Sequence, residues 1–180
     1  LSKRCEPDPS FPHGIISSIY FDTIDWKLLG EKLNSDHLKT KVRLRWYGNP
    51  VTGEILPESF LEYKYKIGSA RKKFRVKTKI DARRLLDKEM ESLEFMNIPK
   101  IAHEYGVTLP HVLYPAFQIN YTRHRYVDSL SGARLAMDSN INVSRVNYRM
   151  VQSNNRTCLS EAVFEVKMSS ASLPDWLHQM

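Results

Sequence analysis

The sequence contains few of the residues and motifs on which several protein classes depend. Only two of its 180 residues are cysteines, Cys5 and Cys158, so no disulfide framework is expected and a reducing, cytoplasmic location is favoured. No apolar run approaches the ~20 residues that a membrane-spanning helix needs. The six histidines lack the spacing of zinc ligands. Neither a Walker loop nor a G-x-G-x-x-G turn occurs, which argues against a Walker-type or Rossmann nucleotide site.

Positive charge is what the chain has in excess. Lys and Arg total 27 against 20 Asp and Glu, which gives a formal net charge of +7 and a pI near 9.4. A hydrophobic content of 42% and a charged content of 26% are ordinary for a globular protein, and the length fits a single domain over residues 1–180. The excess charge therefore indicates an anionic partner, which would be a phosphate compound, a nucleic acid or a membrane surface.

Charged and apolar residues alternate along six segments, most regularly over residues 40–47. In a strand, this alternation places the charged side chains on one face and the apolar side chains on the other. The charged alternates, twelve basic and three acidic, are Lys41, Arg43, Arg45, Glu62, Lys64, Lys66, Arg71, Lys73, Arg75, Arg123, Arg125, Arg134, Asp138, Glu165 and Lys167. If the segments form one sheet, one of its surfaces carries a dense positive field that suits a polyanion such as phosphate.

Most of the chain is predicted to form strands, with two or three helices. The expected strands are residues 15–21, 40–48, 58–68, 70–78, 114–129, 133–146 and 161–169. The expected helices are residues 23–33, residues 81–106 and a segment that starts at Leu173-Pro174-Asp175-Trp176. Asp22 or Thr23 would cap the first helix, Asp81 would open the second, and Pro99 would break or restart it. Residues 1–13, which contain three prolines, are expected to form a loop.

The two faces of such a sheet need different surroundings. The apolar alternates can pack under the expected helices, so the charged face would look to solvent or into the lumen of a barrel. A small barrel normally fills its interior with apolar side chains. Charges crowded into a low dielectric repel one another strongly unless an anion, a metal or water lies among them. A basic lumen is therefore expected chiefly as a binding site.

Six short motifs, in order along residues 15–176, resemble those of the vacuolar transporter chaperone (VTC) domain family. They are Ser18-Ile19-Tyr20-Phe21-Asp22-Thr23, Lys41-Val42-Arg43-Leu44-Arg45-Trp46-Tyr47, Leu61-Glu62-Tyr63-Lys64 with Lys73 in the next strand, Tyr121-Thr122-Arg123, Arg134 through Asp138, and Phe164-Glu165-Val166-Lys167. Each motif alone is weak, but six in sequence are fairly specific. Family members also carry an N-terminal strand with Glu and Lys and a Ser-Lys element in a C-terminal helix, and the domain is expected to lack both here.

The resemblance implies an α+β fold: an antiparallel β-barrel, called the triphosphate tunnel, with a basic lumen and helices packed outside. It also implies a metal-dependent phosphotransferase, a polyphosphate polymerase that makes inorganic polyphosphate from the γ-phosphate of a nucleoside triphosphate (ATP). The implied cofactor is Mn²⁺ or Mg²⁺. The expected partners are ATP, triphosphate and polyphosphate, whereas nucleic acid is not expected to be one.

Phosphoryl transfer needs charge neutralisation and alignment more than covalent help, and guanidinium groups bind phosphate oxygens bidentately. The expected catalytic clamps are Arg43, Arg45, Arg123 and Arg134, and the further phosphate-binding side chains are Lys41, Lys64, Lys66, Lys73, Arg125 and Lys167. Glu165 is the expected metal ligand, since these metals favour carboxylates and substrate oxygens. A salt bridge to a neighbouring Lys or Arg is its other interpretation. Glu62 is expected to hold arginines in place, and Asp138 is expected to be structural.

Three functions stay open from the sequence. The first is the polyphosphate polymerase. The second is a tunnel-fold triphosphatase, which ranks lower because its usual N-terminal Glu-x-Glu-x-Lys strand is not in this chain. The third is a non-catalytic module that binds polyphosphate, inositol phosphates or RNA by charge. Tyrosines beside basic residues can stack on bases, but barrel packing is the favoured interpretation for Tyr20, Tyr47, Tyr63, Tyr65 and Tyr121.

Overall fold

Eight strands, two α-helices and one short 3-10 helix are formed by the residues that the computed structural model describes, which are 4–109, 111–152, 157–168 and 176–177. The elements are β1 (Cys5–Pro7), β2 (His13–Asp22), α1 (Lys27–Leu33), β3 (Leu38–Gly48), β4 (Ile55–Ile67), β5 (Ala70–Lys77), η1 (Ala82–Leu85), α2 (Leu93–Glu104), β6 (Tyr114–Asp128), β7 (Arg134–Val146) and β8 (Val163–Lys167). The helix expected to start at residues 173–176 lies mostly outside the described residues. Within those residues, no helix is both long and apolar enough to cross a bilayer.

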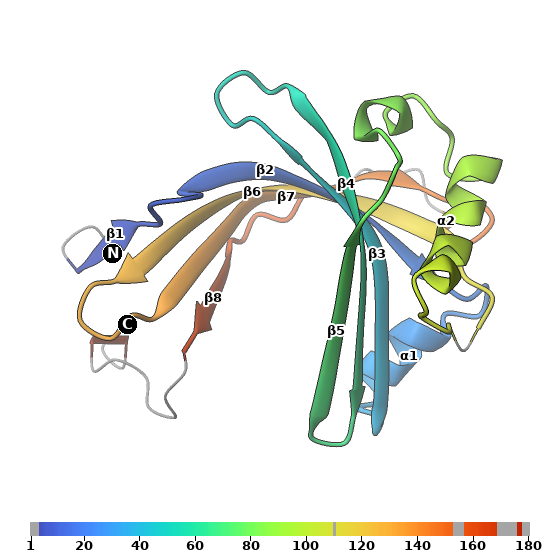
Figure 1. The fold of residues 1–180 in the computed structure, drawn as a ribbon, viewed down its shortest axis with the longest axis horizontal. Coiled ribbons are helices and arrows are strands. Elements are labelled where there is room, and N and C mark those ends of the chain that lie inside the picture. The colour runs from blue at the N-terminus through green and yellow to red at the C-terminus, as the bar shows by residue number, and fades with distance from the viewer. Residues whose placement is uncertain (1–3, 110, 153–156, 169–175, 178–180) are drawn as a thin grey trace.

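All the strands belong to one antiparallel sheet. Their order is β5-β4-β3-β2-β6-β7-β8, and β1 pairs with the end of β6. The sheet curls so that β5 and β8 face each other across a concave space (Figure 1). Register shifts in the β2–β6, β3–β4 and β6–β7 pairs mark the irregularities that help long strands to bend. Among the described residues β5 pairs only with β4 and β8 only with β7, so the expected antiparallel α+β fold is confirmed as a half-barrel.

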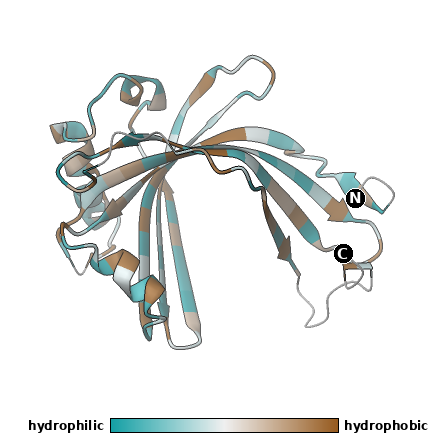
Figure 2. Cartoon of the chain, turned by 180° about the vertical axis from the view of Figure 1, so that it is seen from behind, coloured by the Kyte–Doolittle hydropathy of each residue, from teal (hydrophilic) through white to brown (hydrophobic). Residues whose placement is uncertain are grey.

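The pairing register determines which side chains share a face. Arg43 on β3 lies opposite Glu62 on β4 and Tyr20 on β2, and Arg123 on β6 lies opposite Asp138 on β7. Directly opposed residues of an antiparallel pair project from the same surface. The charged alternates therefore lie together on the concave face, and hydrophilic and hydrophobic residues alternate along the strands (Figure 2).

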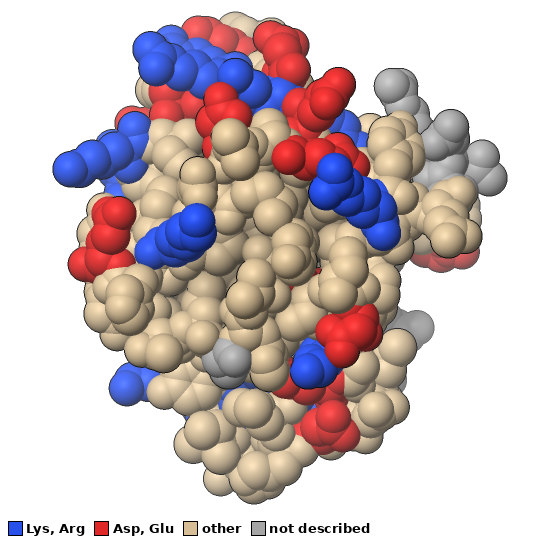
Figure 3. Space-filling model, turned by 90° about the vertical axis from the view of Figure 1, so that its right-hand side faces the viewer, with Lys and Arg blue, Asp and Glu red and all other residues tan. Residues whose placement is uncertain are grey.

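The main hydrophobic core lies on the opposite, convex face, between the sheet and the helices. It contains Ile19, Phe21, Val42, Leu44, Trp46, Leu61 and Tyr63 from the sheet and Leu28, Ala82, Leu85, Met90, Phe95, Ile98 and Ala102 from the helical segments. The helical segments therefore lie outside the curled sheet, as expected. Figure 3 shows the molecule from this side, where basic and acidic side chains are mixed and separated by uncharged surface.

The single helix expected over residues 81–106 is wrong. The chain forms η1 and then α2, with a non-helical connection over residues 86–92. Arg145 on β7 donates from Nη1 to the main-chain carbonyls of Leu85 at 2.9 Å, Leu86 at 3.1 Å and Lys88 at 2.6 Å. In a continuous helix these carbonyls would accept main-chain N–H groups four residues further on. A tertiary contact therefore takes the place of helical hydrogen bonds, and α2 then runs through Pro99 instead of ending there.

The first helix begins four residues later than expected, at Lys27. Both expected caps nevertheless bond to its start. The Asp22 carboxylate accepts the N–H groups of Leu28 at 2.9 Å and Leu29 at 3.0 Å, and Thr23 Oγ1 accepts the N–H of Lys27 at 2.9 Å. Upstream, the loop expected over residues 1–13 is wrong in part, because it contains the three-residue strand β1.

Candidate functional site

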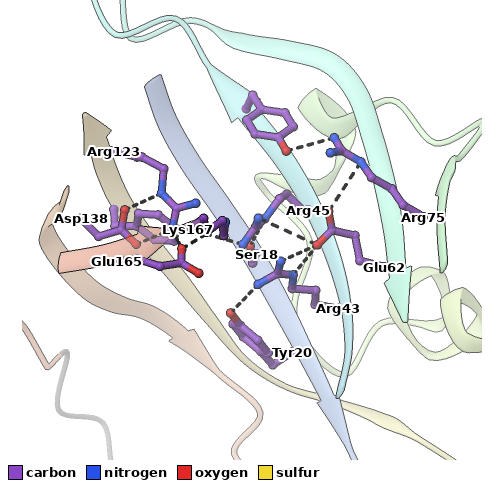
Figure 4. Close-up of polar contacts among 12 residues, drawn as sticks. Ser18, Tyr20, Arg43, Arg45, Glu62, Arg75, Arg123, Asp138, Glu165 and Lys167 are labelled. Carbon is purple, nitrogen blue, oxygen red and sulfur yellow. Dashed lines mark hydrogen bonds and ion pairs between the residues drawn. The ribbon is translucent and has the colours of Figure 1, made fainter. Parts of the chain in front are cut away.

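The ion-paired side chains of the concave face form two groups on opposite walls of the half-barrel (Figure 4). One group, the Glu62 cluster, lies on β3, β4 and β5 and consists of Arg43, Arg45, Glu62 and Arg75. The other, the Asp138 cluster, lies on β6, β7 and β8 and consists of Arg123, Asp138, Glu165 and Lys167. The two groups point toward each other over the central strand β2 (Figure 4).

In the Glu62 cluster, one carboxylate forms ion pairs with three guanidinium groups. Glu62 Oε2 accepts from Arg43 Nε at 2.7 Å, lies 2.5 Å from Arg43 Nη2 and lies 3.9 Å from Arg45 Nη1. Its other oxygen, Oε1, is 3.5 Å from Nε of Arg75. The Glu62 side chain is only 2% exposed. A buried carboxylate in this position fixes the arginines but neutralises one charge of the three, as expected for Glu62.

Hydroxyl groups hold the outer ends of the same arginines. Arg43 Nη1 donates to Tyr20 Oη at 3.2 Å. Arg45, itself 7% exposed, donates from Nε to Ser18 Oγ at 3.1 Å and from Nη2 to Tyr121 Oη at 3.0 Å. Arg75 Nη2 donates to Tyr47 Oη at 3.0 Å, and its guanidinium lies over the Phe60 ring at 4.1 Å. Neutral partners of this kind orient a guanidinium group and leave its charge uncompensated.

The pKa values on this wall reflect the surplus of positive charge. Burial opposes ionisation of Glu62, but the charges of Arg43 and Arg45 outweigh it and lower the pKa of that carboxyl. Burial likewise opposes the ionised form of Tyr20, whereas Lys41 and then Arg43 bring the pKa of the phenol below its usual value. Desolvation, followed by the charge of Arg43, lowers the pKa of Lys64. The wall therefore favours any negative charge placed on it.

The Asp138 cluster is nearly balanced in charge. Arg123 donates from Nε to Asp138 Oδ1 at 2.5 Å and from Nη2 to Oδ2 at 2.6 Å, a bidentate pair. The hydrogen bond to Asp138 is the main reason why the pKa of Arg123 is raised. Glu165 Oε2 lies 4.0 Å from Arg123 Nη2 and 3.3 Å from Lys167 Nζ. Asp138 is thus structural, as expected, and Arg123 is largely engaged with it.

Several expected phosphate-binding lysines lie at the α1 end of the concave face. Lys41, Lys64, Lys66 and Lys73 line a pocket of about 640 Å³ there. None of them forms an ion pair within 4.0 Å with a carboxylate in the described part of the chain. This pocket therefore extends the positive field of the Glu62 cluster along the face.

Two expected site residues border these groups but form no ion pair in the described part of the chain. Arg134, the first residue of β7, lies opposite Lys167 and roughly 13 Å along the strand from Asp138. Arg125 donates from Nη1 to the carbonyl of Phe11 at 3.1 Å and lines a second pocket, of about 670 Å³, with Arg75. The structure therefore brings Arg43 and Arg45 together in one cluster and places Arg123 in the other, but leaves Arg134 at the strand end.

Of the three carboxylates in the two clusters, Glu165 has the best access for a divalent cation. Its side chain is 45% exposed on the concave face, and Oε1 carries neither of its two ion-pair contacts. No group of three or more metal-ligating side chains occurs among the described residues. Mg²⁺ is commonly bound through one or two carboxylates together with substrate phosphates. The residues present therefore fit a metal that arrives with its phosphate ligand, and both interpretations of Glu165 stay open.

The sequence interpretation did not choose Arg75, which belongs to the Glu62 cluster, or Tyr20 and Ser18, which accept hydrogen bonds from its arginines. Arg75 lies directly opposite Glu62 in the β4–β5 hairpin. The turn Gly68-Ser69, which joins the paired residues Ile67 and Ala70, fixes this register, so the turn was the signal that could have found Arg75. Tyr20 and Ser18 come from the pairing of β2 with β3, for which no short turn in the sequence supplies a register.

Comparison with known families agrees with this geometry. The model of the VTC domain matches residues 6–180, which is nearly the whole chain. The chain therefore belongs to the VTC domain family, as the six motifs predicted. A search of curated proteins finds no match to the chain.

Proposed function

We propose that this chain binds triphosphate and polyphosphate on its concave face and acts as a metal-dependent phosphotransferase that makes inorganic polyphosphate from the γ-phosphate of ATP. The observation that carries the proposal is the Glu62 cluster, where three guanidinium groups share one buried carboxylate beside lysines that have no ion-pair partner within the described residues. Membership of the VTC family, which is associated with polyphosphate synthesis, supports it. The two free cysteines support a cytoplasmic setting.

In this proposal, the side chains on β3, β4 and β5 align the bound phosphates and neutralise their charge. Arg43 is held on one side by Glu62 and on the other by Tyr20, so its orientation is fixed before a ligand arrives. Arg45 is similarly fixed by Ser18 and Tyr121. Fixed donors stabilise charge that develops during phosphoryl transfer without reorganising. Lys64 and Lys73 add mobile point charges that can follow different phosphates of a chain.

Glu165 would hold the Mn²⁺ or Mg²⁺ that the family implies. When bound, such a metal neutralises phosphate oxygens and polarises the phosphorus centre. Glu165 faces the Glu62 cluster from the opposite wall (Figure 4), so phosphates lying between the walls would meet cations on one side and this carboxylate on the other. We further propose that the half-barrel is part of a closed tunnel, since β5 and β8 each pair on one side only within the described residues.

Product analysis with ATP and Mn²⁺ tests the activity. Long phosphate chains are the expected product. Release of orthophosphate alone would favour a triphosphatase, and the absence of both, with polyphosphate still bound, would favour a non-catalytic binding module.

Calorimetric titration with tripolyphosphate at two salt concentrations tests the binding step separately. Affinity should fall as salt rises, because the attraction rests on several partly exposed cations. Binding that does not depend on salt, or no heat at low salt, would contradict the proposal.

A further inference from the structure

Three aromatic rings lie in a row along one side of the α1-end pocket. The Tyr20 and Phe117 rings are stacked with centroids 5.4 Å apart, and the Phe117 and Trp26 rings with centroids 6.3 Å apart. Tyr20 comes from β2, Phe117 from the paired position on β6, and Trp26 from the residue before α1. All three line the pocket of about 640 Å³. The indole of Trp26 ends the row, so an aromatic surface borders the pocket at the foot of α1.

The backbone of Trp26 adopts an unusual conformation. Its φ of 58° and ψ of 36° lie in the left-handed region, which bulky non-glycine residues rarely occupy. The Trp26 N–H donates to the carbonyl of Thr23 at 3.0 Å, and the side chain lies against Phe117. Such backbone strain concentrates at functional sites and persists only where the surroundings impose it. The fold therefore fixes the indole at this pocket despite a local cost.

The other walls of the pocket are strongly basic. Lysines and arginines from α1, β3, β4 and β5 contribute, among them Lys39, Lys41 and Lys73. Asp22 is the one carboxylate in this lining, and its oxygens accept main-chain N–H groups at the start of α1. An aromatic surface beside cations fits a ligand that carries both a planar ring and several negative charges. A polyphosphate chain alone has no planar ring that could stack on the aromatic surface.

Tyr20 joins this pocket to the Glu62 cluster. Its ring forms the end of the aromatic row opposite Trp26 and lies 4.7 Å from Lys41 Nζ, while its hydroxyl accepts a hydrogen bond from Arg43. Neighbouring side chains on β6, β2 and β3 therefore form a continuous path from the aromatic surface to the arginines. A ligand that stacks in the pocket can extend its charges over Lys41 to the arginines.

We propose that this pocket is a nucleobase subsite, in which the base of a nucleoside triphosphate stacks on Trp26 while its phosphates lie over Lys41 and the Glu62 cluster. The inference rests on the proposed function, because it requires triphosphate on the concave face. Stacking is tolerant of base identity. The subsite therefore recognises a nucleoside triphosphate as a class and discriminates little between adenine and guanine.

The test compares ATP with inorganic tripolyphosphate, titrated calorimetrically without metal into the whole chain and into the Trp26→Ala variant. The variant should bind ATP about tenfold more weakly, since a base stacked on an aromatic side chain contributes a factor of this order. Its affinity for tripolyphosphate should not change. Trp26→Phe, which keeps an aromatic ring, should recover most of the ATP affinity. Leu33→Ala, an exposed change at the last residue of α1 and outside the pocket lining, serves as the control for disturbance of the helix and should alter neither affinity.

The outcomes separate this inference from the proposed function. Failure of the unaltered chain to bind tripolyphosphate would overturn the proposed function and the subsite together. Tripolyphosphate binding with an ATP affinity that Trp26→Ala leaves unchanged would overturn the subsite alone. An equal loss of affinity for both ligands would also overturn it, because Trp26 would then act through the shape of the phosphate site. Thermal unfolding of each variant verifies that α1 remains folded.

Discussion

The two walls of the half-barrel use their carboxylates in opposite ways. On the β3–β5 wall, Glu62 is almost fully buried and three arginines share it. On the β6–β8 wall, Arg123 forms a bidentate pair with Asp138, and Lys167 lies beside the half-exposed Glu165. The Glu62 cluster on the first wall keeps a surplus of positive charge, whereas the Asp138 cluster on the second is nearly neutral. The difference suggests that the first wall holds the phosphate chain and that the second supplies the counter-charges that a metal needs.

The largest effect is expected for Glu165→Gln, measured as turnover of ATP in the presence of Mn²⁺. If Glu165 holds the metal, loss of its negative charge should lower turnover by about 100-fold or more, because a neutral amide is a poor ligand for a hard cation. Tripolyphosphate should still bind, since the variant removes repulsion rather than attraction. Glu161→Gln, just before β8, is the matched control. Normal turnover at ordinary metal concentrations would leave Glu165 as a salt-bridge partner only.

Glu62→Gln should produce the largest loss of stability. Removing this buried charge leaves three arginines facing one another and should lower the free energy of unfolding by about 3–5 kcal/mol. Asp138→Asn on the other wall exposes a single arginine and should cost about 1–3 kcal/mol. Urea unfolding of both variants measures the difference, and tripolyphosphate should restore more stability to Glu62→Gln than to Asp138→Asn. Equal losses would show that the two carboxylates stabilise the two walls to the same extent.

Arg43→Ala should weaken tripolyphosphate binding by about 1.5–3 kcal/mol, or roughly 10- to 150-fold, the range of charge-assisted hydrogen bonds. Turnover should fall with it, because Arg43 is expected to contact the same phosphate that reacts. Calorimetry and initial rates give both numbers. Lys79→Ala, an exposed change beyond the end of β5, controls for the loss of one positive charge. A similar loss of affinity in that variant would show that only net charge matters.

Acid should destabilise the β3–β5 wall. The folded-state pKa of Glu62 lies below its ordinary value of 4.5. The stabilisation that Glu62 provides is therefore present above about pH 4.5 and is lost as the pH falls through the lower folded value. Unfolding followed between pH 6 and pH 3 should show this decline, and Glu62→Gln should show a smaller one. An unchanged slope in the variant would assign the acid sensitivity to other carboxyl groups.

The smallest effect is expected for Lys167→Ala measured without phosphate. The Lys167–Glu165 pair is exposed on both sides, at 62% and 45%, so its loss should change the free energy of unfolding by about 1 kcal/mol or less. Thermal unfolding at low salt is the most sensitive measurement. A larger loss would mean that the β6–β8 wall is held together more like the β3–β5 wall than the geometry indicates.

The strands could be predicted from the sequence because their alternation is local. Seven strands, β2 to β8, lie within a few residues of the expected ranges, since charged and apolar residues alternate in six of them and β2 is rich in β-branched and aromatic residues. The helical region could not be predicted in the same way. Leu85, Leu86 and Met90 have helical spacing, but Arg145, far away in sequence, captures the carbonyls that a helix would use. The helix propensity of this segment is overridden by a hydrogen-bond donor from a distant strand.

The sequence predicts that the charged residues share one surface of the sheet. It does not predict that they divide into two clusters on opposite walls. Alternation places all the charged side chains on one face. It does not reveal that Glu62 is shared by three arginines whereas Asp138 is taken by Arg123 alone. That division depends on cross-strand register and on burial, both of which follow from how the sheet curls. Arg134, expected among the clamps, lies at the end of β7, where the expected strand over residues 133–146 already placed it.

One consequence of the open sheet concerns the solubility of the chain. Within the described residues, β5 has one side without a strand partner, and an unpaired strand edge is a template for joining another chain. Five of its eight residues are Lys or Arg, at positions 71, 72, 73, 75 and 77. Two such edges repel each other, so wherever the tunnel is not closed the positive charge that suits a phosphate chain also opposes self-association. A multivalent anion would reduce this electrostatic repulsion between β5 edges. The chain should therefore aggregate most readily when short polyphosphate is present at substoichiometric amounts.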